Sequence, residues 1–94
     1  MIIVAVKITT LAGKRDAMLD RARVLVDLTR QEPGNISYGF YSAADDPDGI
    51  LIFELWASQQ ALDEHKKTAH FLDFIKEAPT FKKGEEVKLF EVQE

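Results

Sequence analysis

Residues 51–74, LIFELWASQQALDEHKKTAHFLDF, contain the only Trp, both His residues and a Glu that is set among large apolar residues. Residues 50–56 are rich in β-branched and aromatic side chains and follow a turn sequence, which is typical of a strand. Ser58 can accept a hydrogen bond from free backbone N–H groups, and residues 59–67 are good helix formers. This stretch predicts a strand, apolar on both faces, that leads directly into a helix.

Length and composition indicate a single globular domain, residues 1–94, with 46% hydrophobic and 30% charged residues. The net charge of −4 and the lack of a basic cluster argue against nucleic acid as a partner. The absence of Cys excludes disulfides, a thiolate nucleophile and Cys-based metal sites. The apolar run Ile2–Val6 is too short to span a membrane and lacks the basic start of a signal peptide. We therefore expect a cytoplasmic protein with no membrane partner.

The remaining periodicity predicts the other elements. Apolar residues recur at helical spacing between residues 14 and 31, and Pro33 with Gly34 ends that helix. A second helical region follows residue 58, is interrupted at Thr68, and stops at Pro79. The expected strands are 2–9, 36–43, 50–56 and 86–93, and residues 80–85 are expected to form a polar connection.

The order strand, helix, strand, strand, helix, strand indicates an α+β fold of the ferredoxin-like β-α-β-β-α-β type. Such a sheet carries its helices on one face only. Because three of the expected strands are apolar on both faces, the second face needs a cover. We therefore expect a homodimer in which two sheets pack face to face.

Three motifs together resemble the antibiotic biosynthesis monooxygenase (ABM) family, and the likeness covers nearly the whole chain. The motifs are E-x-G-x-x-x-Y at residues 32–38, E-x-W-x-S-x-x-A-L at residues 54–62 and H-x-x-T-x-H at residues 65–70. Among the members of this family, the chain resembles small quinol monooxygenases and the enzyme that processes phosphorylated autoinducer-2. The resemblance implies the dimeric α+β barrel, which agrees with the plan reached from periodicity.

The resemblance also implies oxygen insertion into electron-rich phenols and hydroquinones with no cofactor, because the substrate itself supplies electrons to O₂. Trp56 lies where the polyketide-oxidising members have a pocket Trp, whereas their Asn and Tyr fall on Ile52 and Leu62. The haem site of haem-degrading relatives is missing, because its Asn, Trp and His fall on Lys7, His65 and Ile75.

The two His residues are candidate catalytic groups. His65 should face the sheet, and its side chain titrates near neutral pH, which suits a general base that removes a phenol or enol proton; it could equally be a packed, hydrogen-bonded core residue. His70 follows five positions later, so an unbroken helix would point the rings about 140° apart. They converge only if the chain breaks at Thr68, and His70 could instead bond backbone at a helix start. No third ligand has recognisable spacing, so we expect no metal site.

Glu54 is the third candidate catalytic residue, because it lies in a strand that should be buried on both faces. A buried carboxylate must be protonated, hydrogen-bonded or paired with a cation. It could orient His65 or bind a substrate hydroxyl, or it could pair with Lys7 or Lys88 on another strand.

Four further residues are candidate substrate contacts. Trp56 could stack on a planar ring or belong to the core, and Phe71 could cap a pocket or close the core. Tyr38 and Tyr41 point to opposite faces of their strand, so at most one lines a given pocket. Asn35 could contact the substrate, although it is first a turn residue.

The leading hypothesis is a cofactor-independent monooxygenase that oxidises a quinol-like or polyphenolic small molecule with O₂, using His65 as base and Glu54 and Trp56 as supporting groups. The first alternative is an isomerase or proton-transfer enzyme acting on a small carbonyl compound. The second is a dimer that binds a small molecule without turnover, since fold does not fix function.

Overall fold

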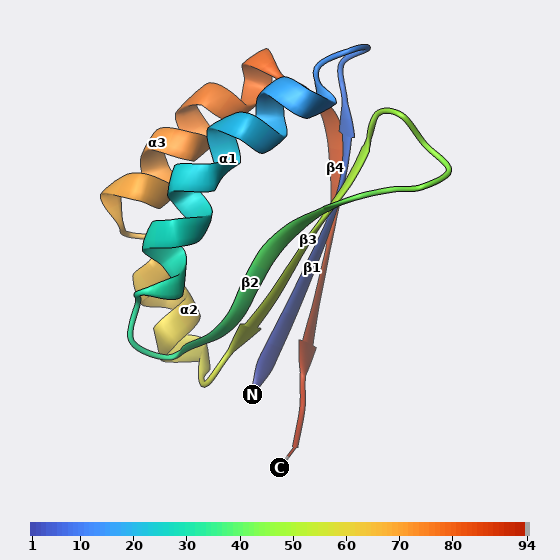
Figure 1. The fold of residues 1–94 in the computed structure, drawn as a ribbon. Coiled ribbons are helices and arrows are strands. Elements are labelled where there is room, and N and C mark those ends of the chain that lie inside the picture. The colour runs from blue at the N-terminus through green and yellow to red at the C-terminus, as the bar shows by residue number, and fades with distance from the viewer. Residues whose placement is uncertain (94) are drawn as a thin grey trace.

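A computed structural model describes residues 1–93 of the chain, and its elements follow the expected order (Figure 1). The elements are β1 (Ile2–Thr10), α1 (Arg15–Arg30), β2 (Asn35–Ser42), β3 (Gly49–Trp56), α2 (Gln59–His65), α3 (Ala69–Glu77), the 3-10 turn η1 (Ala78–Thr80) and β4 (Lys82–Glu91). The strands form an antiparallel sheet in the order β2-β3-β1-β4, and the helices cover one face of it. The ferredoxin-like α+β prediction is therefore confirmed.

The strand register decides which side chains meet the helices. Val4 of β1 lies opposite Glu54 of β3, and Val6 lies opposite Ile52, so these residues share the helix side of the sheet. Tyr38 of β2 joins the same side through its pairing with Glu54. The core therefore lies between this face and the buried side chains of the helices, which are Met18, Ala22, Leu25, Thr29, Leu62, His65 and Phe74.

The predicted interruption of the second helical region is confirmed, and each of the two resulting helices begins at its own N-cap. The Ser58 side chain accepts a hydrogen bond from the backbone N–H of Ala61 and begins α2, as the sequence indicated. Thr68 is extended, and its hydroxyl accepts a hydrogen bond from the backbone N–H of Phe71 to begin α3. The break lets α3 leave in a new direction, and His70 is placed on its first turn.

The last strand begins at Lys82, so the prediction of a polar connection over residues 80–85 was wrong for residues 82–85. Lys82 pairs with Thr10 and Gly84 with Thr9, across an irregularity in the register between the two. Because β4 is an edge strand, its polar side chains can stay in water while its backbone completes the sheet. Sequence polarity therefore did not reveal the pairing.

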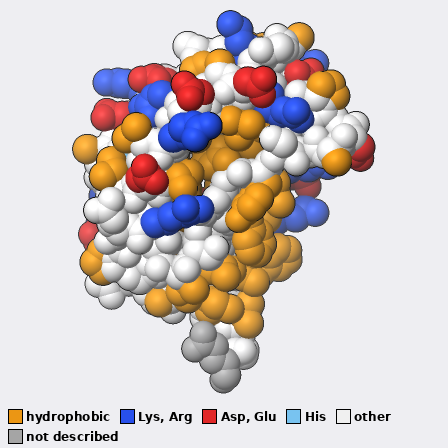
Figure 2. Space-filling model, in the orientation of Figure 1, with side chains coloured by type: hydrophobic (Ala, Val, Ile, Leu, Met, Phe, Trp, Pro, Cys, Tyr) orange, Lys and Arg blue, Asp and Glu red, His pale blue; other side chains and the backbone are white. Residues whose placement is uncertain are grey.

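The sheet face opposite the helices carries many apolar side chains. Register places Ile3, Ala5, Tyr41, Leu51, Phe53, Leu55 and Phe90 on this open face. In the view of Figure 2, hydrophobic side chains gather over the part of the strands near the chain termini. Within residues 1–93, no helix is long and apolar enough to cross a membrane.

Gly34 closes the connection between α1 and β2 and packs against α2. It has a φ of +84°, and a Cβ at this position would lie 2.6 Å from Cβ of Ala61. Gly13 also has a positive φ, of +75°, but a Cβ there would meet nothing within 4 Å. A side chain at Gly13 would therefore meet backbone strain alone, whereas a side chain at Gly34 would meet both backbone strain and a steric clash.

We expect Gly34→Ala to lower the free energy of unfolding by about 2–4 kcal/mol, because left-handed strain and a steric clash combine. Gly13→Ala should cost only about 1 kcal/mol, because it adds the strain alone. Urea denaturation of both variants measures the difference. Adding Ala61→Gly to Gly34→Ala removes the clash, so the double variant should be more stable than the two single losses predict. Strict additivity would contradict this contact.

Candidate active site

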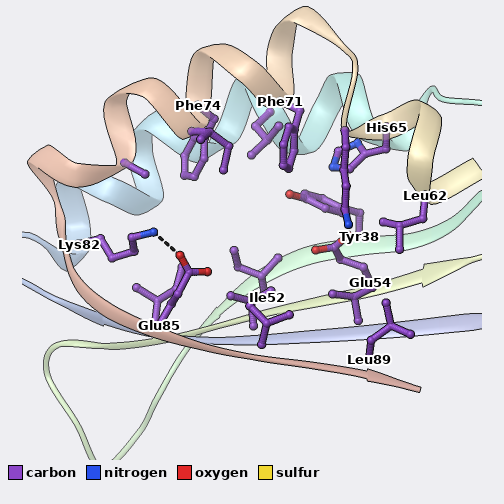
Figure 3. A pocket seen from close by; sticks show the side chains of 18 of the residues that line it. Tyr38, Ile52, Glu54, Leu62, His65, Phe71, Phe74, Lys82, Glu85 and Leu89 are labelled. Atoms are coloured by element: carbon purple, nitrogen blue, oxygen red, sulfur yellow. Dashed lines mark hydrogen bonds and ion pairs between the residues drawn. The ribbon is translucent and has the colours of Figure 1, made fainter. Parts of the chain in front are cut away.

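A cavity of about 210 Å³ lies between the helices and the sheet, and its walls are mostly apolar. Figure 3 shows His65, Phe71 and Phe74 reaching it from the helices, and Tyr38, Ile52 and Glu54 from the sheet. One end is polar, with Tyr38, Glu54 and His65 close together (Figure 3), and the charge of Lys66 acts on both Glu54 and His65. The other end contains Lys82 and Glu85, which are paired with each other. A planar apolar ligand with a polar edge would match this distribution.

His65 is the last residue of α2, and its side chain is only 1% exposed. Its Nδ1 lies 2.7 Å from Oε2 of Glu32. The ring packs against Trp56 at 4.7 Å and against the edge of Phe71 at 4.9 Å between ring centres. Nε2 is buried and has no hydrogen-bond partner in the described part of the chain. Because His65 lines the cavity, Nε2 is the atom left available to a bound molecule.

Glu32 lies in the turn after α1 and binds both His residues through one oxygen atom. Its Oε2 is 2.7 Å from Nδ1 of His65 and 2.7 Å from Nε2 of His70. An ionised carboxylate only accepts hydrogen bonds, so each of these nitrogens carries a proton and donates it. This arrangement assigns the lone pair of His65 to Nε2. The helix is interrupted at Thr68, and this interruption brings the two imidazole rings together. A continuous helix would have kept them apart.

The environment of His65 favours its neutral form. Burial lowers the pKa of its imidazole, and the hydrogen bond and negative charge of Glu32 oppose this shift without overcoming it. The charges of His70 and Lys66 lower the pKa further. A neutral ring with a free Nε2 lone pair is the form that a general base requires.

Glu54 lies on the floor of the cavity but does not contact the partners expected from the sequence. Its Oε1 accepts a hydrogen bond of 2.9 Å from Nε1 of Trp56, two residues along the same strand face. Among residues 1–93, no ion pair joins Glu54 to Lys7 or Lys88, because Lys7 points to the open face and the nearest carboxylate to Lys88 is Glu86. Glu32, which we had not considered as a site residue, takes the His65-orienting position proposed for Glu54.

Burial raises the pKa of Glu54 to about 7, although the hydrogen bond from Trp56 and the charge of Lys66 lower it. Burial also raises the pKa of the Tyr38 phenol, and the charges of Glu54 and Glu32 raise it further. Near neutral pH the polar end therefore holds a neutral imidazole, a neutral phenol and a carboxyl group that is about half protonated, beside the Lys66 ammonium. Two of them, Glu54 and Tyr38, can donate a hydrogen bond to a ligand oxygen.

The other predicted contacts divide into two groups. Tyr38 and Phe71 line the cavity, whereas Tyr41 lies on the open face, as the alternation predicted. Trp56 is fully buried behind the cavity wall, where it packs on His65 and donates to Glu54. The Asn35 side chain donates to the backbone carbonyls of Ser37 and Leu55 and does not line the cavity. Trp56 and Asn35 therefore act as supports for the site in this structure.

Sequence reasoning missed Glu32 and Lys66. Glu32 stands 33 positions before His65, so no local spacing connects the two. Lys66 follows His65 directly and lies among residues 59–67, which the sequence analysis considered only as helix formers. The one available signal was that residues 65–70 end one helix and begin another, because residues at such ends can point back toward a preceding turn.

Glu32, His65 and His70 are also the one group of His, Asp or Glu side chains, among the described residues, whose ligand atoms lie close enough to hold a metal ion. Each offers one atom, and these atoms lie within 4.8 Å of one another. The expectation of no metal site was based on the lack of a third ligand with recognisable spacing. Glu32 offers that third ligand atom from 33 positions before His65, a separation that no spacing pattern connects.

Comparisons with known proteins identify similar chains. A model of the antibiotic biosynthesis monooxygenase family matches residues 1–77. "Uncharacterized protein sll1783" of Synechocystis sp. is 32% identical over 94 residues, which are 99% of this chain but 64% of that protein, so the chain spans just under two thirds of that relative. "Putative monooxygenase YcnE" of Bacillus subtilis is 31% identical over 75 residues, 80% of this chain and 79% of that protein.

Solved structures agree with this similarity. A crystal structure described as an antibiotic biosynthesis monooxygenase matches this chain over 100% of both chains, with a TM-score of 0.89 and 27% identity.

We expect Glu54 to make stability depend on pH. Its folded pKa of about 7 exceeds the ordinary value of 4.5, so the folded state retains the proton more strongly. The protonated Glu54 carboxyl contributes fully to the free energy of unfolding below pH 4.5. This contribution is lost as the pH rises through 7, and the total loss is about 3 kcal/mol. Glu54→Gln stays neutral and keeps an acceptor for Trp56. Its free energy of unfolding should therefore fall less than that of the wild type between pH 5 and 8, as measured by urea denaturation. Parallel pH profiles would contradict the raised pKa.

Proposed function

The chain belongs to the antibiotic biosynthesis monooxygenase family, and from this premise we propose that it oxidises a quinol-like or polyphenolic small molecule with O₂ and without a cofactor. The observation that carries the proposal is the buried Nε2 of His65, which has no partner within residues 1–93 and belongs to a ring that lines the cavity. Family membership supplies the reaction class, and the cavity supplies a base, a proton donor and apolar walls.

His65 removes the substrate's hydroxyl proton through Nε2. Glu32 holds Nδ1–H, so it fixes the tautomer and ring orientation and stabilises the imidazolium that forms. The resulting phenolate or quinol anion is electron-rich and reduces O₂. One oxygen atom is inserted into a ring C–H, the other leaves as water, and all four electrons come from the substrate, which leaves as a quinone. His65 returns its proton to the departing oxygen, which closes the cycle.

The polar end of the cavity stabilises the anion. Protonated Glu54 donates a hydrogen bond to a substrate oxygen, and the Lys66 ammonium supplies positive charge on the same side. Tyr38 provides a second neutral donor. Phe71 and Ile52 form apolar walls on either side of a flat ring. The volume of about 210 Å³ is smaller than the roughly 300–1,000 Å³ of typical ligand pockets, which favours a substrate of one or two rings.

The same groups would serve a proton-transfer enzyme on a small carbonyl compound, the second candidate. Abstraction of a proton next to a carbonyl needs a base and a donor, and His65 and Glu54 are placed for both roles. Two Lys residues line the cavity. Lys82 is paired with Glu85, whereas Lys66 has no ion pair among residues 1–93 and could therefore bind a phosphate group. Dependence on O₂ separates this reaction from the proposed one. A cavity filled by Trp56, Phe71 and Phe74 would favour the non-catalytic alternative. Phe71 and Phe74 line the cavity and leave it about 210 Å³, and Trp56 is not among the lining residues.

We expect the purified protein, treated with a chelator, to consume O₂ saturably with a panel of reduced quinones and polyphenols. His65→Ala should reduce the rate by about 100- to 10,000-fold, because it removes the base. Glu32→Gln should also reduce the rate, because its amide can present an N–H to His65 and reverse the tautomer. An oxygen electrode measures each rate above the spontaneous one. The matched control is Glu64→Gln, an exposed substitution on the same helix as His65, which should keep the wild-type rate.

Wild-type uptake no faster than the spontaneous reaction, or full activity in His65→Ala, would exclude the proposed mechanism. Product formation at the same rate without O₂ would establish the proton-transfer reaction in its place.

We also propose that the protein is a homodimer whose open sheet faces pack together, because an unpaired chain would leave Leu51 and Phe90 in water. Leu51→Asp and Phe90→Asp should shift the sedimentation equilibrium mass from that of two chains to that of one. Val24→Asp replaces an exposed apolar residue on α1 and should leave the mass unchanged. A monomeric wild type, or dimers that survive both sheet substitutions, would refute this arrangement.

A further inference from the structure

The cluster of Glu32, His65 and His70 has the chemical character of a metal site. Two imidazole nitrogens point at one carboxylate oxygen, each at 2.7 Å, and the three ligand atoms lie within 4.8 Å of one another. We propose that Glu32, His65 and His70 bind a divalent transition-metal cation such as Zn²⁺, which replaces the two protons between them. This inference goes beyond the proposed function and does not depend on it.

The donor set suits a borderline cation. Zn²⁺ prefers imidazole nitrogen and carboxylate oxygen at about 2.0–2.2 Å, so ligand atoms around a tetrahedral ion are about 3.4 Å apart. The two His–Glu contacts must therefore lengthen by less than an ångström, and the widest pair of atoms must shorten by a little more than one. Rotation of the Glu32 carboxylate lengthens the two His–Glu contacts, and rotation of the partly exposed His70 side chain brings the two His nitrogens closer together.

The ion has a path to the cluster from solvent. The side chains of Glu32 and His70 are 12% and 17% exposed, whereas that of His65 is 1% exposed. An ion therefore reaches Glu32 and His70 first and takes His65 as its innermost ligand. A water molecule can complete the coordination on the exposed side.

Metal binding and hydrogen bonding require opposite tautomers of the same rings. In the hydrogen-bonded state, Nδ1 of His65 and Nε2 of His70 carry protons, because both donate to Glu32. To ligate a metal, the same two nitrogens must present lone pairs. A neutral His65 then carries its proton on Nε2, and a neutral His70 carries its proton on Nδ1. No net proton is released when both rings start neutral, so the change is a tautomeric switch.

This switch connects the metal to the cavity. With the metal on Nδ1, the Nε2 atom of His65 becomes an N–H donor and loses the lone pair that a base needs. The bound cation therefore acts as an inhibitor of any proton abstraction by His65, whatever the substrate. The cluster has two exclusive states, one with two protons and one with a metal ion.

The first test is Zn²⁺ binding to the untagged, chelator-treated protein, followed by competition with a chromophoric zinc chelator. We expect one Zn²⁺ per chain. Glu32→Gln and His70→Gln should each weaken binding by more than about tenfold, because each removes a ligand. Glu64→Gln removes an exposed carboxylate elsewhere on α2 and should bind as the wild type does. Circular dichroism checks that each variant is folded.

The second readout is ¹⁵N NMR of the imidazole rings, which distinguishes the two tautomers directly. Zn²⁺ should move the His65 proton from Nδ1 to Nε2 in the wild type and leave it on Nδ1 in His70→Gln. Binding that is absent, or equally strong in Glu32→Gln and His70→Gln, would overturn the proposal. Neither measurement uses a substrate, so an inactive protein that binds Zn²⁺ in this way would disprove the proposed reaction and leave the metal site standing.

Discussion

The site depends on the two hydrogen bonds that Oε2 of Glu32 accepts, because they join three parts of the chain. Glu32 lies in the turn after α1, His65 ends α2, and His70 lies in the first turn of α3. A carboxylate with little access to water needs hydrogen-bond donors, and the two rings supply them. The contact with His65 fixes its tautomer and therefore leaves the lone pair of the ring on Nε2. Packing and chemistry are linked here by one oxygen atom.

The fold could be predicted from the sequence because it is encoded in local patterns. Alternation in the strands, helical spacing after residue 14, and capping residues at Ser58 and Thr68 each act within a few positions. The contact between Glu32 and His65 has no such pattern, since it joins residues 33 apart through the tertiary fold. The Trp56–Glu54 hydrogen bond was accessible in principle, because residues two apart on a strand share a face. The start of β4 was hidden, because an edge strand does not need apolar alternation.

The two carboxylates of the site show how environment assigns different roles to one residue type. Glu32 accepts hydrogen bonds from two ring nitrogens, and its side chain is 12% exposed. Glu54 has one donor, Trp56, and apolar neighbours, and its pKa rises to about 7. One carboxylate can therefore hold a His proton in place while the other retains its own proton for donation. The burial that raises the pKa of Glu54 also costs stability at alkaline pH, so the protein carries an energetic cost for a neutral donor.

The edge position of β4 explains how a ligand can reach the buried base. Val87 and Leu89 share the helix side of the sheet with Val6 and Val4, yet they are 57% and 48% exposed. The helix layer buries the partners on β1 and leaves β4 uncovered, so the cavity has an open side along this strand. Leu89 lies level with Glu54 in the sheet, because both residues pair with Val4, so this open side runs past the polar end of the cavity. A ligand that enters there with one polar edge can place that edge against Glu54 and His65, the groups that can move its proton, and its apolar part against Phe71 and Phe74.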